Sequence, residues 1–171
     1  MSMSHDTSVI VIMASCIQQP FVLVIDDNRA AADLMVELLQ ASGCSSSAAY
    51  GGISGIEAIT NYSPDVVLLD LLMPEVDGFE VASTINQLAM SARPVLVAFS
   101  ALSDAATIKR AMMSGFDFHL PKPAMLNQVI AVIANARALK EKATVNPLVS
   151  GALTLNAAGQ VPPAFSYKSG F

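Results

Sequence analysis

Five polar side chains in this sequence follow apolar runs and together could support phosphoryl transfer. Asp26 and Asp27 end one apolar run, Asp70 ends a later one, and Ser100 and Lys122 follow two more. If these runs are parallel strands, their carboxyl ends meet at one edge of a sheet, where open sheets bind ligands. We therefore expect the five side chains to share one site.

The chemistry expected of this set follows from charge repulsion. Three carboxylates within reach of one another repel, and burial would drive one of them to protonate. Mg²⁺ would relieve this, because it takes a few carboxylate oxygens plus waters and leaves positions open for phosphate oxygens. Lys122 would supply a point charge and Ser100 a hydroxyl donor for further phosphate oxygens. Asp70 would then accept the phosphoryl group as an acyl phosphate.

Asp70 is the central residue of this hypothesis because of the run that precedes it. Residues 66–69 are Val-Val-Leu-Leu between Pro64 and Pro74, which predicts a strand buried on both faces. A carboxylate at the end of such a strand costs solvation free energy unless a cation or a donor meets it. The simpler alternative is an aspartate that only caps the following loop.

Strand-like and helix-like patterns alternate over about residues 20–143. The strands are predicted at 21–25, 44–50, 66–69, 95–99 and 116–120, and the helices at 30–42, 54–61, 78–88, 104–114 and 124–142. In the first helix the apolar face is expected to contain Ala31, Leu34, Met35, Leu38 and Leu39. This alternation predicts right-handed βαβ units, and so an α/β fold with a parallel sheet covered by helices on both faces.

Length and composition narrow the class of protein. The 171 residues predict one domain with a full core. A net charge of −5 argues against a nucleic-acid surface. Cys16 and Cys44 have neither metal-site nor disulfide-framework spacing, which favours a reducing compartment. The apolar stretch at 9–17 is too short to span a bilayer and lacks the basic flank of a secretory signal. We therefore expect a soluble, cytoplasmic protein without a membrane partner.

The strand-end residues resemble those of a known family. The segments Val24-Ile25-Asp26-Asp27, Val67-Leu68-Leu69-Asp70-Leu71-Leu72-Met73-Pro74 with Asp77-Gly78, Ser100-Ala101 and Lys122-Pro123 stand in the family's order. They resemble the receiver domain of bacterial two-component response regulators, of the chemotaxis and hybrid-kinase types, over about residues 20–143. The resemblance implies a flavodoxin-like, doubly wound, five-stranded sheet in the order 2-1-3-4-5.

The resemblance also implies a role for each acidic residue. Asp70 matches the aspartate that accepts the phosphoryl group. Asp27 matches the direct Mg²⁺ ligand, and Asp26 matches the residue that binds the ion through water. Leu72 matches the position whose backbone carbonyl is a further ligand, so its side chain is not required. The implied metal set is thus Asp26, Asp27, Asp70 and Leu72, with Mg²⁺ as the cofactor.

Ser100, Lys122 and His119 match the remaining functional positions. The hydroxyl at the Ser100 position moves onto the phosphoryl oxygen after transfer in the family, and the Lys122-Pro123 bond is usually cis, which X–Pro bonds permit. His119 stands where many receivers have an aromatic residue that rotates inward in the phosphorylated state. A histidine there recurs in receivers of hybrid sensor kinases. The alternatives are a switch residue and an ordinary half-exposed strand histidine.

The function implied is that of a phospho-accepting signalling module. A histidine kinase or histidine phosphotransfer protein would donate the group, and the face around the fourth helix, fifth strand and fifth helix would bind a downstream partner or a second copy. This is not an enzyme acting on a metabolite. The alternative is a receiver-like scaffold that works without phosphorylation. An aspartyl-phosphate phosphatase would need a second carboxylate where Leu72 stands, and a flavodoxin would not carry Asp26-Asp27 in its phosphate loop.

Two further features concern leucines and the ends of the sequence. Leu72 and Leu102 stand at positions that are often polar in fast-cycling receivers, which suggests slow self-dephosphorylation. The alternative is that the two side chains only pack together.

Residues 1–19 are expected to be an N-terminal extension, either an extra strand or a disordered segment. Residues 144–171 are a low-charge tail without a recognisable output domain.

Overall fold

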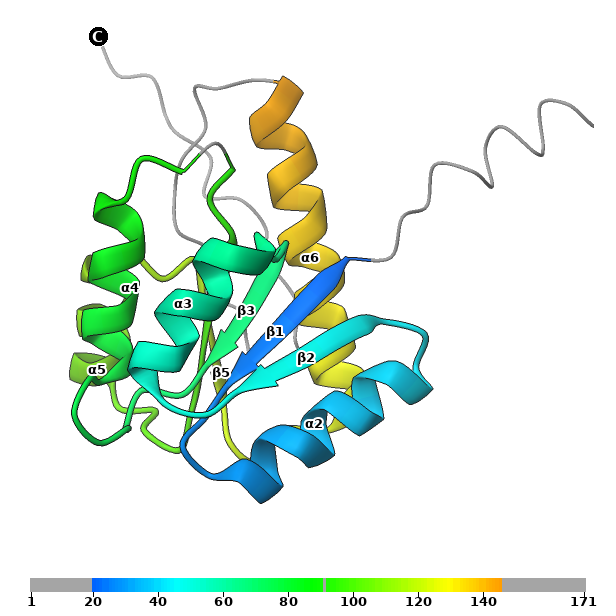
Figure 1. The fold of residues 1–171 in the computed structure, drawn as a ribbon, viewed down its shortest axis with the longest axis horizontal. Coiled ribbons are helices and arrows are strands. Elements are labelled where there is room, and N and C mark those ends of the chain that lie inside the picture. Colours follow the sequence, from blue (N-terminus) through cyan, green and yellow to red (C-terminus); the bar gives the residue numbers. More distant parts are fainter. Residues whose placement is uncertain (1–19, 91, 146–171) are drawn as a thin grey trace, which may run out of the picture.

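A parallel sheet of five strands lies at the centre of the fold (Figure 1). The computed structural model describes residues 20–90 and 92–145, with the backbone alone from 141 to 145. The strands are β1 (Phe21–Ile25), β2 (Ser45–Ala49), β3 (Val66–Leu69), β4 (Val95–Ser100) and β5 (Phe118–Pro121). All four pairings are parallel and the order is β2-β1-β3-β4-β5. The predicted fold class and strand order are confirmed.

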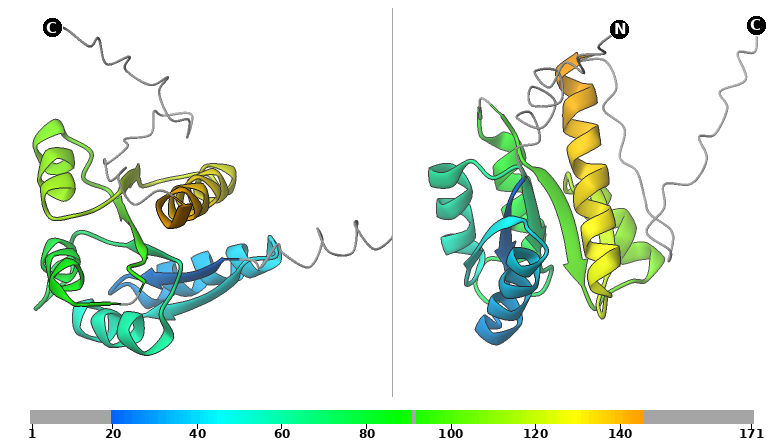
Figure 2. Two further views of the ribbon diagram at one scale, coloured as in Figure 1. Left: turned by 90° about the horizontal axis from the view of Figure 1, so that it is seen from above. Right: turned by 90° about the vertical axis from the view of Figure 1, so that its right-hand side faces the viewer.

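Helices cover both faces of the sheet (Figure 2). They are α2 (Arg29–Ala41), α3 (Gly52–Tyr62), α4 (Gly78–Gln87), α5 (Ala105–Met113) and α6 (Leu126–Val145). One hydrophobic core joins the sheet to α3, α4 and α5, and a second joins it to α2 and α6. Every residue of β3 and β4 is therefore buried, as expected for central strands of a doubly covered parallel sheet.

Polar residues at the carboxyl ends of the strands also start the helices that follow. The side chain of Asn28 accepts a hydrogen bond from the amide of Ala31 at the start of α2. Asp77 and Asp104 cap α4 and α5 in the same way. Because these caps satisfy amides that have no partner within the helix, they fix where each helix begins relative to the sheet edge.

The apolar face predicted for α2 is only partly buried. Leu34 is 56% exposed and Leu38 is 36% exposed, whereas Ala32 and Leu39 are fully buried. Ala31 is exposed as well. The helix lies over β1 and the edge strand β2, so only a narrow strip of its surface meets the sheet. The periodicity predicted the helix correctly, but only part of the predicted apolar face is buried.

Smaller corrections concern element ends. Leu88 ends α4 as an extended residue, 42% exposed, and does not belong to its buried face. Phe116 is buried but precedes β5, because its amide donates to the Ala111 carbonyl of α5 instead of joining the sheet. The predictions for residues 1–19 and for 146–171 lie outside the described residues. Among the described residues, none of the helices is both long enough and apolar enough to span a membrane.

Candidate functional site

Three carboxylates converge at the carboxyl edge of the sheet. One oxygen from each of Asp26, Asp27 and Asp70 can lie within 4.8 Å of the others. They meet because β1 and β3 are adjacent strands, and the Asp70 amide donates to the Ile25 carbonyl at 2.9 Å. Asp26 is buried, Asp70 is half-buried and Asp27 is exposed. The structure therefore brings together the three acidic side chains singled out in the sequence, with one side of the cluster open to solvent.

Lys122 is the cation of this cluster. Its Nζ lies 2.6 Å from Asp26 Oδ2 and 3.3 Å from Asp70 Oδ1. The ammonium also lies 5.0 Å from the centroid of the Phe99 ring. The Lys122 amide donates to the Ser100 carbonyl at 2.9 Å, and the bond to Pro123 is cis, as expected. One ammonium against three carboxylates leaves two negative charges in the cluster without a counter-ion.

The electrostatics of Asp70 reflect this imbalance. Burial raises the pKa of the Asp70 carboxyl above its ordinary value, the attraction of Lys122 works in the opposite direction, and the nearby charge of Asp26 raises it further. The surroundings of Asp70 thus stabilise its ionised form less well than water does. A divalent cation at this position would reverse that balance, because it is the largest charge such a site can acquire.

The donor set suits a hard divalent cation. All three clustered side chains offer carboxylate oxygens, and no described nitrogen or sulfur ligand joins them. Oxygen donors on one side and solvent on the other match the way Mg²⁺ is held by few carboxylates and several waters. The Leu72 side chain is 56% exposed, and a role for its carbonyl stays a prediction.

Ser100 and His119 are connected through the backbone of Leu102, by its amide and its carbonyl respectively. Ser100 is 1% exposed, and its Oγ accepts a hydrogen bond from the Leu102 amide at 3.3 Å. His119 is 5% exposed, and its Nε2 lies 2.9 Å from the Leu102 carbonyl oxygen. Because a carbonyl only accepts hydrogen bonds, this contact assigns the proton to Nε2. His119 is therefore a buried, hydrogen-bonded residue, and the alternative of a half-exposed strand histidine is wrong.

Gly78 is a site residue whose contact with Asp70 the sequence did not reveal. A Cβ at this position would overlap the Asp70 carbonyl oxygen and would lie 2.9 Å from Leu71 Cα. The Gly78 amide donates to the Leu71 carbonyl at 3.1 Å. Only a residue without a side chain lets α4 begin directly against the backbone that carries Asp70. The pair Asp77-Gly78 was recognisable as a helix start, but its contact partner was not.

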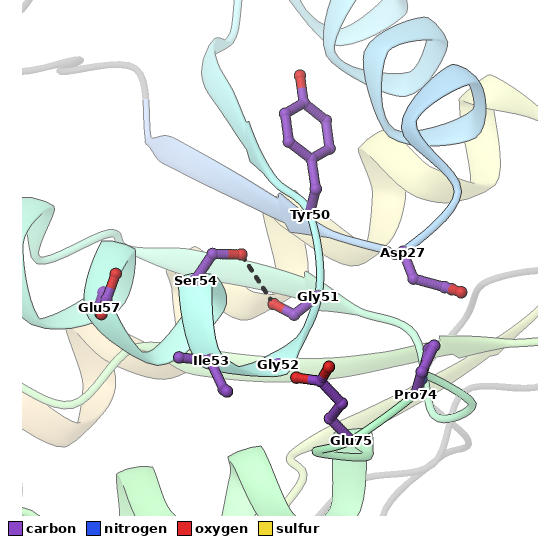
Figure 3. A pocket seen from close by; sticks show the side chains of 9 residues that line it. All are labelled: Asp27, Tyr50, Gly51, Gly52, Ile53, Ser54, Glu57, Pro74 and Glu75. Atoms are coloured by element: carbon purple, nitrogen blue, oxygen red, sulfur yellow. Dashed lines mark hydrogen bonds between the residues drawn. The ribbon is translucent and has the colours of Figure 1, made fainter.

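A hollow of about 360 Å³ adjoins the cluster on the Asp27 side (Figure 3). Its lining includes the carboxylates of Asp27, Glu57 and Glu75, the ring of Tyr50, and residues 51–54. No basic side chain is among the residues that line it. The hollow therefore extends the negative charge of the cluster outward, past the start of α3.

The fold and site are those of a signalling domain. The family model of the response regulator receiver domain matches residues 22–134. The chain belongs to this family, and it is a receiver domain of the kind found in two-component systems.

Individual relatives agree with this assignment. The response regulator MprA of a Mycobacterium species is 33% identical over 110 residues, which cover 64% of this chain and 47% of the relative. The DNA-binding dual master transcriptional regulator RpaA of a Synechocystis species is 31% identical over 112 residues, covering 66% of this chain and 46% of the relative. The match thus spans less than half the length of these curated relatives.

Solved receiver structures share the fold. A response regulator signal receiver domain from Bermanella marisrubri is 27% identical with a TM-score of 0.64, over 70% of this chain and 99% of the other. A CheY-like receiver domain protein from Methanospirillum hungatei has a TM-score of 0.67 over 73% of this chain and 98% of the other. Its 19% identity supports the fold alone.

Proposed function

We propose that this receiver accepts a phosphoryl group on Asp70 in a Mg²⁺-dependent reaction and thereby switches a surface that a partner binds. The observation that carries the proposal is the cluster of Asp26, Asp27 and Asp70, whose oxygens can lie within 4.8 Å of one another, with Lys122 Nζ 3.3 Å from Asp70. The negative charge of this site exceeds its positive charge, and its half-buried carboxylate, Asp70, lies beside the ammonium of Lys122.

The transfer step follows from these groups. A carboxylate oxygen of Asp70 forms a bond to phosphorus, and the bond from phosphorus to the donor atom breaks with its electron pair leaving on the donor. Asp26, Asp27 and Asp70 would hold Mg²⁺, which supplies positive charge to the transferring phosphoryl oxygens. Lys122, already 3.3 Å from Asp70, would then neutralise a phosphoryl oxygen.

The switching step uses the chain of contacts from Ser100 to His119. If the Ser100 hydroxyl turns toward the phosphoryl group, the Leu102 amide loses its present acceptor. The carbonyl of Leu102 is also in contact with His119, so a movement of the Leu102 backbone would be felt by His119 as well. Phosphorylation would act by shifting the population between two arrangements, one of which a partner binds better.

The partners proposed are those of a phosphorelay. A histidine kinase or a histidine phosphotransfer protein would donate the group in the cytoplasm. A downstream protein or a second copy of the chain would bind the face formed by α5, β5 and α6. The domain takes part in its own phosphorylation but is proposed not to be an enzyme that acts on a metabolite.

The test is phosphoryl incorporation from a small acyl phosphate, followed by intact-protein mass spectrometry. Wild type should gain one phosphoryl group only when Mg²⁺ is present, and Asp70→Asn should gain none. Asp65→Asn is the matched control, because Asp65 lies at the other end of the same strand, β3, and should leave incorporation unchanged. Failure of wild type to incorporate the group or to bind beryllium fluoride would favour the scaffold alternative.

The lifetime of the phosphoryl group offers a second test. Leu72 is 56% exposed and Leu102 is half-buried, so neither leucine is confined to a shared core. We expect the two apolar side chains to hinder an attacking water, so that the doubly substituted chain with Leu72→Asn and Leu102→Gln loses the phosphoryl group severalfold faster. Decay is followed by mass spectrometry after removal of the donor. An unchanged decay rate would contradict the proposed role of these leucines.

A further inference from the structure

Arg110 connects the two helices that follow Asp70 and Ser100 along the chain. These are α4, which begins beyond the loop after Asp70, and α5, which begins beyond the loop after Ser100. Arg110 lies in the last turn of α5, and its guanidinium carbon lies 3.7 Å from the centroid of the Phe79 ring. Its Nη2 lies 3.5 Å from Asp77 Oδ2. Because Phe79 and Asp77 belong to the start of α4, this side chain joins α5 to α4.

The start of α4 is fixed against the phosphoryl-acceptor site. A Cβ on Gly78 would overlap the Asp70 carbonyl oxygen, so the helix begins in direct contact with the backbone that carries Asp70. Five residues of α4 are buried, among them Phe79, which is 4% exposed. Asp77 Oδ1 accepts a hydrogen bond from the Glu80 amide at 2.8 Å and so caps the first turn. The start of α4 therefore cannot shift without disturbing the Asp70 backbone.

The helix α5 covers the same face of the sheet as α4 but is attached less firmly (Figure 1). Ala111 is its one buried residue, whereas α2, α3, α4 and α6 each bury two or more. Its N-cap, Asp104, comes directly after the loop in which the Leu102 amide donates to Ser100 Oγ. Because little apolar surface is buried, displacing α5 costs little free energy. This helix can therefore follow a movement of the Ser100 hydroxyl and its loop.

We propose that Arg110 is a positioning residue that holds α5 in the arrangement in which the Leu102 amide donates to Ser100, and that it thereby opposes phosphorylation of Asp70. Its contacts join a fixed element to a movable one, so a shift of α5 breaks them. A contact made in only one of two arrangements favours that arrangement by the free energy of the contact. The regulation rests on the function proposed above, whereas the attachment of α5 to α4 does not.

The expected size of the effect follows from the exposure of Arg110. Its side chain is 62% exposed and that of Asp77 is 38% exposed, so solvent screening weakens their attraction. The cation–π contact with Phe79 contributes a similarly small amount at an exposed site. Together these contacts should change the equilibrium between the two arrangements by about fivefold.

The attachment is tested by hydrogen exchange on the full chain, measured by mass spectrometry without a phosphodonor. Amides of α5 should exchange about fivefold faster in Arg110→Ala than in wild type, while those of α6 keep the wild-type rate and report that the variant is folded. Lys109→Ala is the matched control, because it removes the same charge from the neighbouring exposed position of α5. Equal α5 exchange in Arg110→Ala and Lys109→Ala would overturn the attachment.

Asp77→Asn tests whether the contact with α4 is the cause. Asparagine keeps an oxygen that can cap α4 but removes the charge beside Arg110. We expect a smaller increase in α5 exchange than for Arg110→Ala, because the contact with the Phe79 ring remains. Asp77→Asn should have no further effect in a chain that already carries Arg110→Ala. Fully additive effects of the two substitutions would overturn the contact as the cause.

The regulation is tested by the affinity for beryllium fluoride in the presence of Mg²⁺, followed by fluorine NMR. Arg110→Ala should bind it about fivefold more tightly than wild type, and Lys109→Ala should bind it as wild type does. A purely structural role would not strengthen binding. Faster α5 exchange with unchanged or weaker binding would overturn the regulation and leave the attachment. If wild type binds no beryllium fluoride, the proposed function fails and the regulation with it, while the exchange data still decide the attachment.

Discussion

Asp65 and Asp70 flank the same four-residue strand, β3, yet the two aspartates are bonded in opposite ways. At the amino end, Asp65 Oδ2 accepts from the Phe21 amide at 3.0 Å and Oδ1 accepts from Lys140 Nζ at 2.8 Å. At the carboxyl end, Asp70 has Lys122 Nζ at 3.3 Å, which is closer still to Asp26. One carboxylate has partners on both oxygens, and the other shares a single cation.

The pKa values follow the bonding. Burial alone would raise the pKa of Asp65, but the hydrogen bonds from Lys140 and from the Phe21 amide outweigh it and hold the pKa below its usual value. For Asp70, burial prevails over Lys122, and the pKa is raised. The amino end of the sheet is therefore most stable with its carboxylate charged. The carboxyl end gains stability when a further positive charge neutralises Asp70, as expected for a site that binds a ligand.

The largest change in stability should come from a second ion pair at the amino end of the sheet, between Arg93 and Asp117. Arg93 bonds Asn86 Oδ1 at 2.5 Å, Asp117 Oδ2 at 2.8 Å and the Gly115 carbonyl, so it joins the end of α4 to the turn after α5. Arg93→Ala should lower the free energy of unfolding by about 2 kcal/mol, because it removes all three of these hydrogen bonds and the ion pair with Asp117. Urea titration measures this.

The control for Arg93 is Lys109→Ala, which changes an exposed residue of α5 and should cost less than about 0.5 kcal/mol. Phosphoryl incorporation by folded Arg93→Ala should equal that of wild type. A stability loss as small as that of the control would mean that the amino end is not held by its charges.

The second prediction, for Asp70→Asn, is a gain in stability and not a loss. Asp70→Asn should raise the free energy of unfolding by about 1 kcal/mol in metal-free buffer at pH 7, since it removes a half-buried carboxylate that is incompletely neutralised. Lys122 keeps its contact with Asp26. Mg²⁺ should then stabilise wild type but not this variant, as followed by thermal unfolding with and without the ion. Destabilisation by Asp70→Asn would remove the contrast between the two ends.

The smallest change in stability is expected for Asp65→Asn. Its pKa is lower in the folded state than in the unfolded state, so its contribution is present above the unfolded value of about 3.9 and is lost as the pH falls through the folded value. Because 44% of the side chain is exposed, solvent screening limits this contribution to less than about 1 kcal/mol. Asp65→Asn should therefore be slightly less stable than wild type at pH 7 and equal to it near pH 2. A constant difference across that range would show that ionisation is not the cause.

The sequence predicted the features that depend on local pattern. Apolar runs that end in Asp26, Asp70 or Lys122 identified the strands and their carboxyl ends, and parallel pairing then brought those ends together. The pattern could not show how much of α2 the sheet covers, because coverage depends on the position of β2 at the sheet edge. The periodicity placed Leu34 and Leu38 on the apolar face of the helix, and only the structure shows that they line a surface groove.

Contacts between distant residues were the other features that could not be predicted. Arg93 reaches Asp117 across 24 positions, and His119 reaches the Leu102 carbonyl across 17. No spacing rule connects such pairs, because they depend on how the loops between strands and helices are folded. Residue type identified His119 as a candidate, and only the structure supplied its partner.

Gly78 has a consequence for how mutations in this domain should be interpreted. Every other residue type would add an atom where the Asp70 carbonyl oxygen already lies. In a comprehensive mutational scan, position 78 should thus tolerate substitution as poorly as position 70 does, although it contributes no atom to the transfer step. A tolerance map alone would count it among the reactive residues, when its role is to leave space for one.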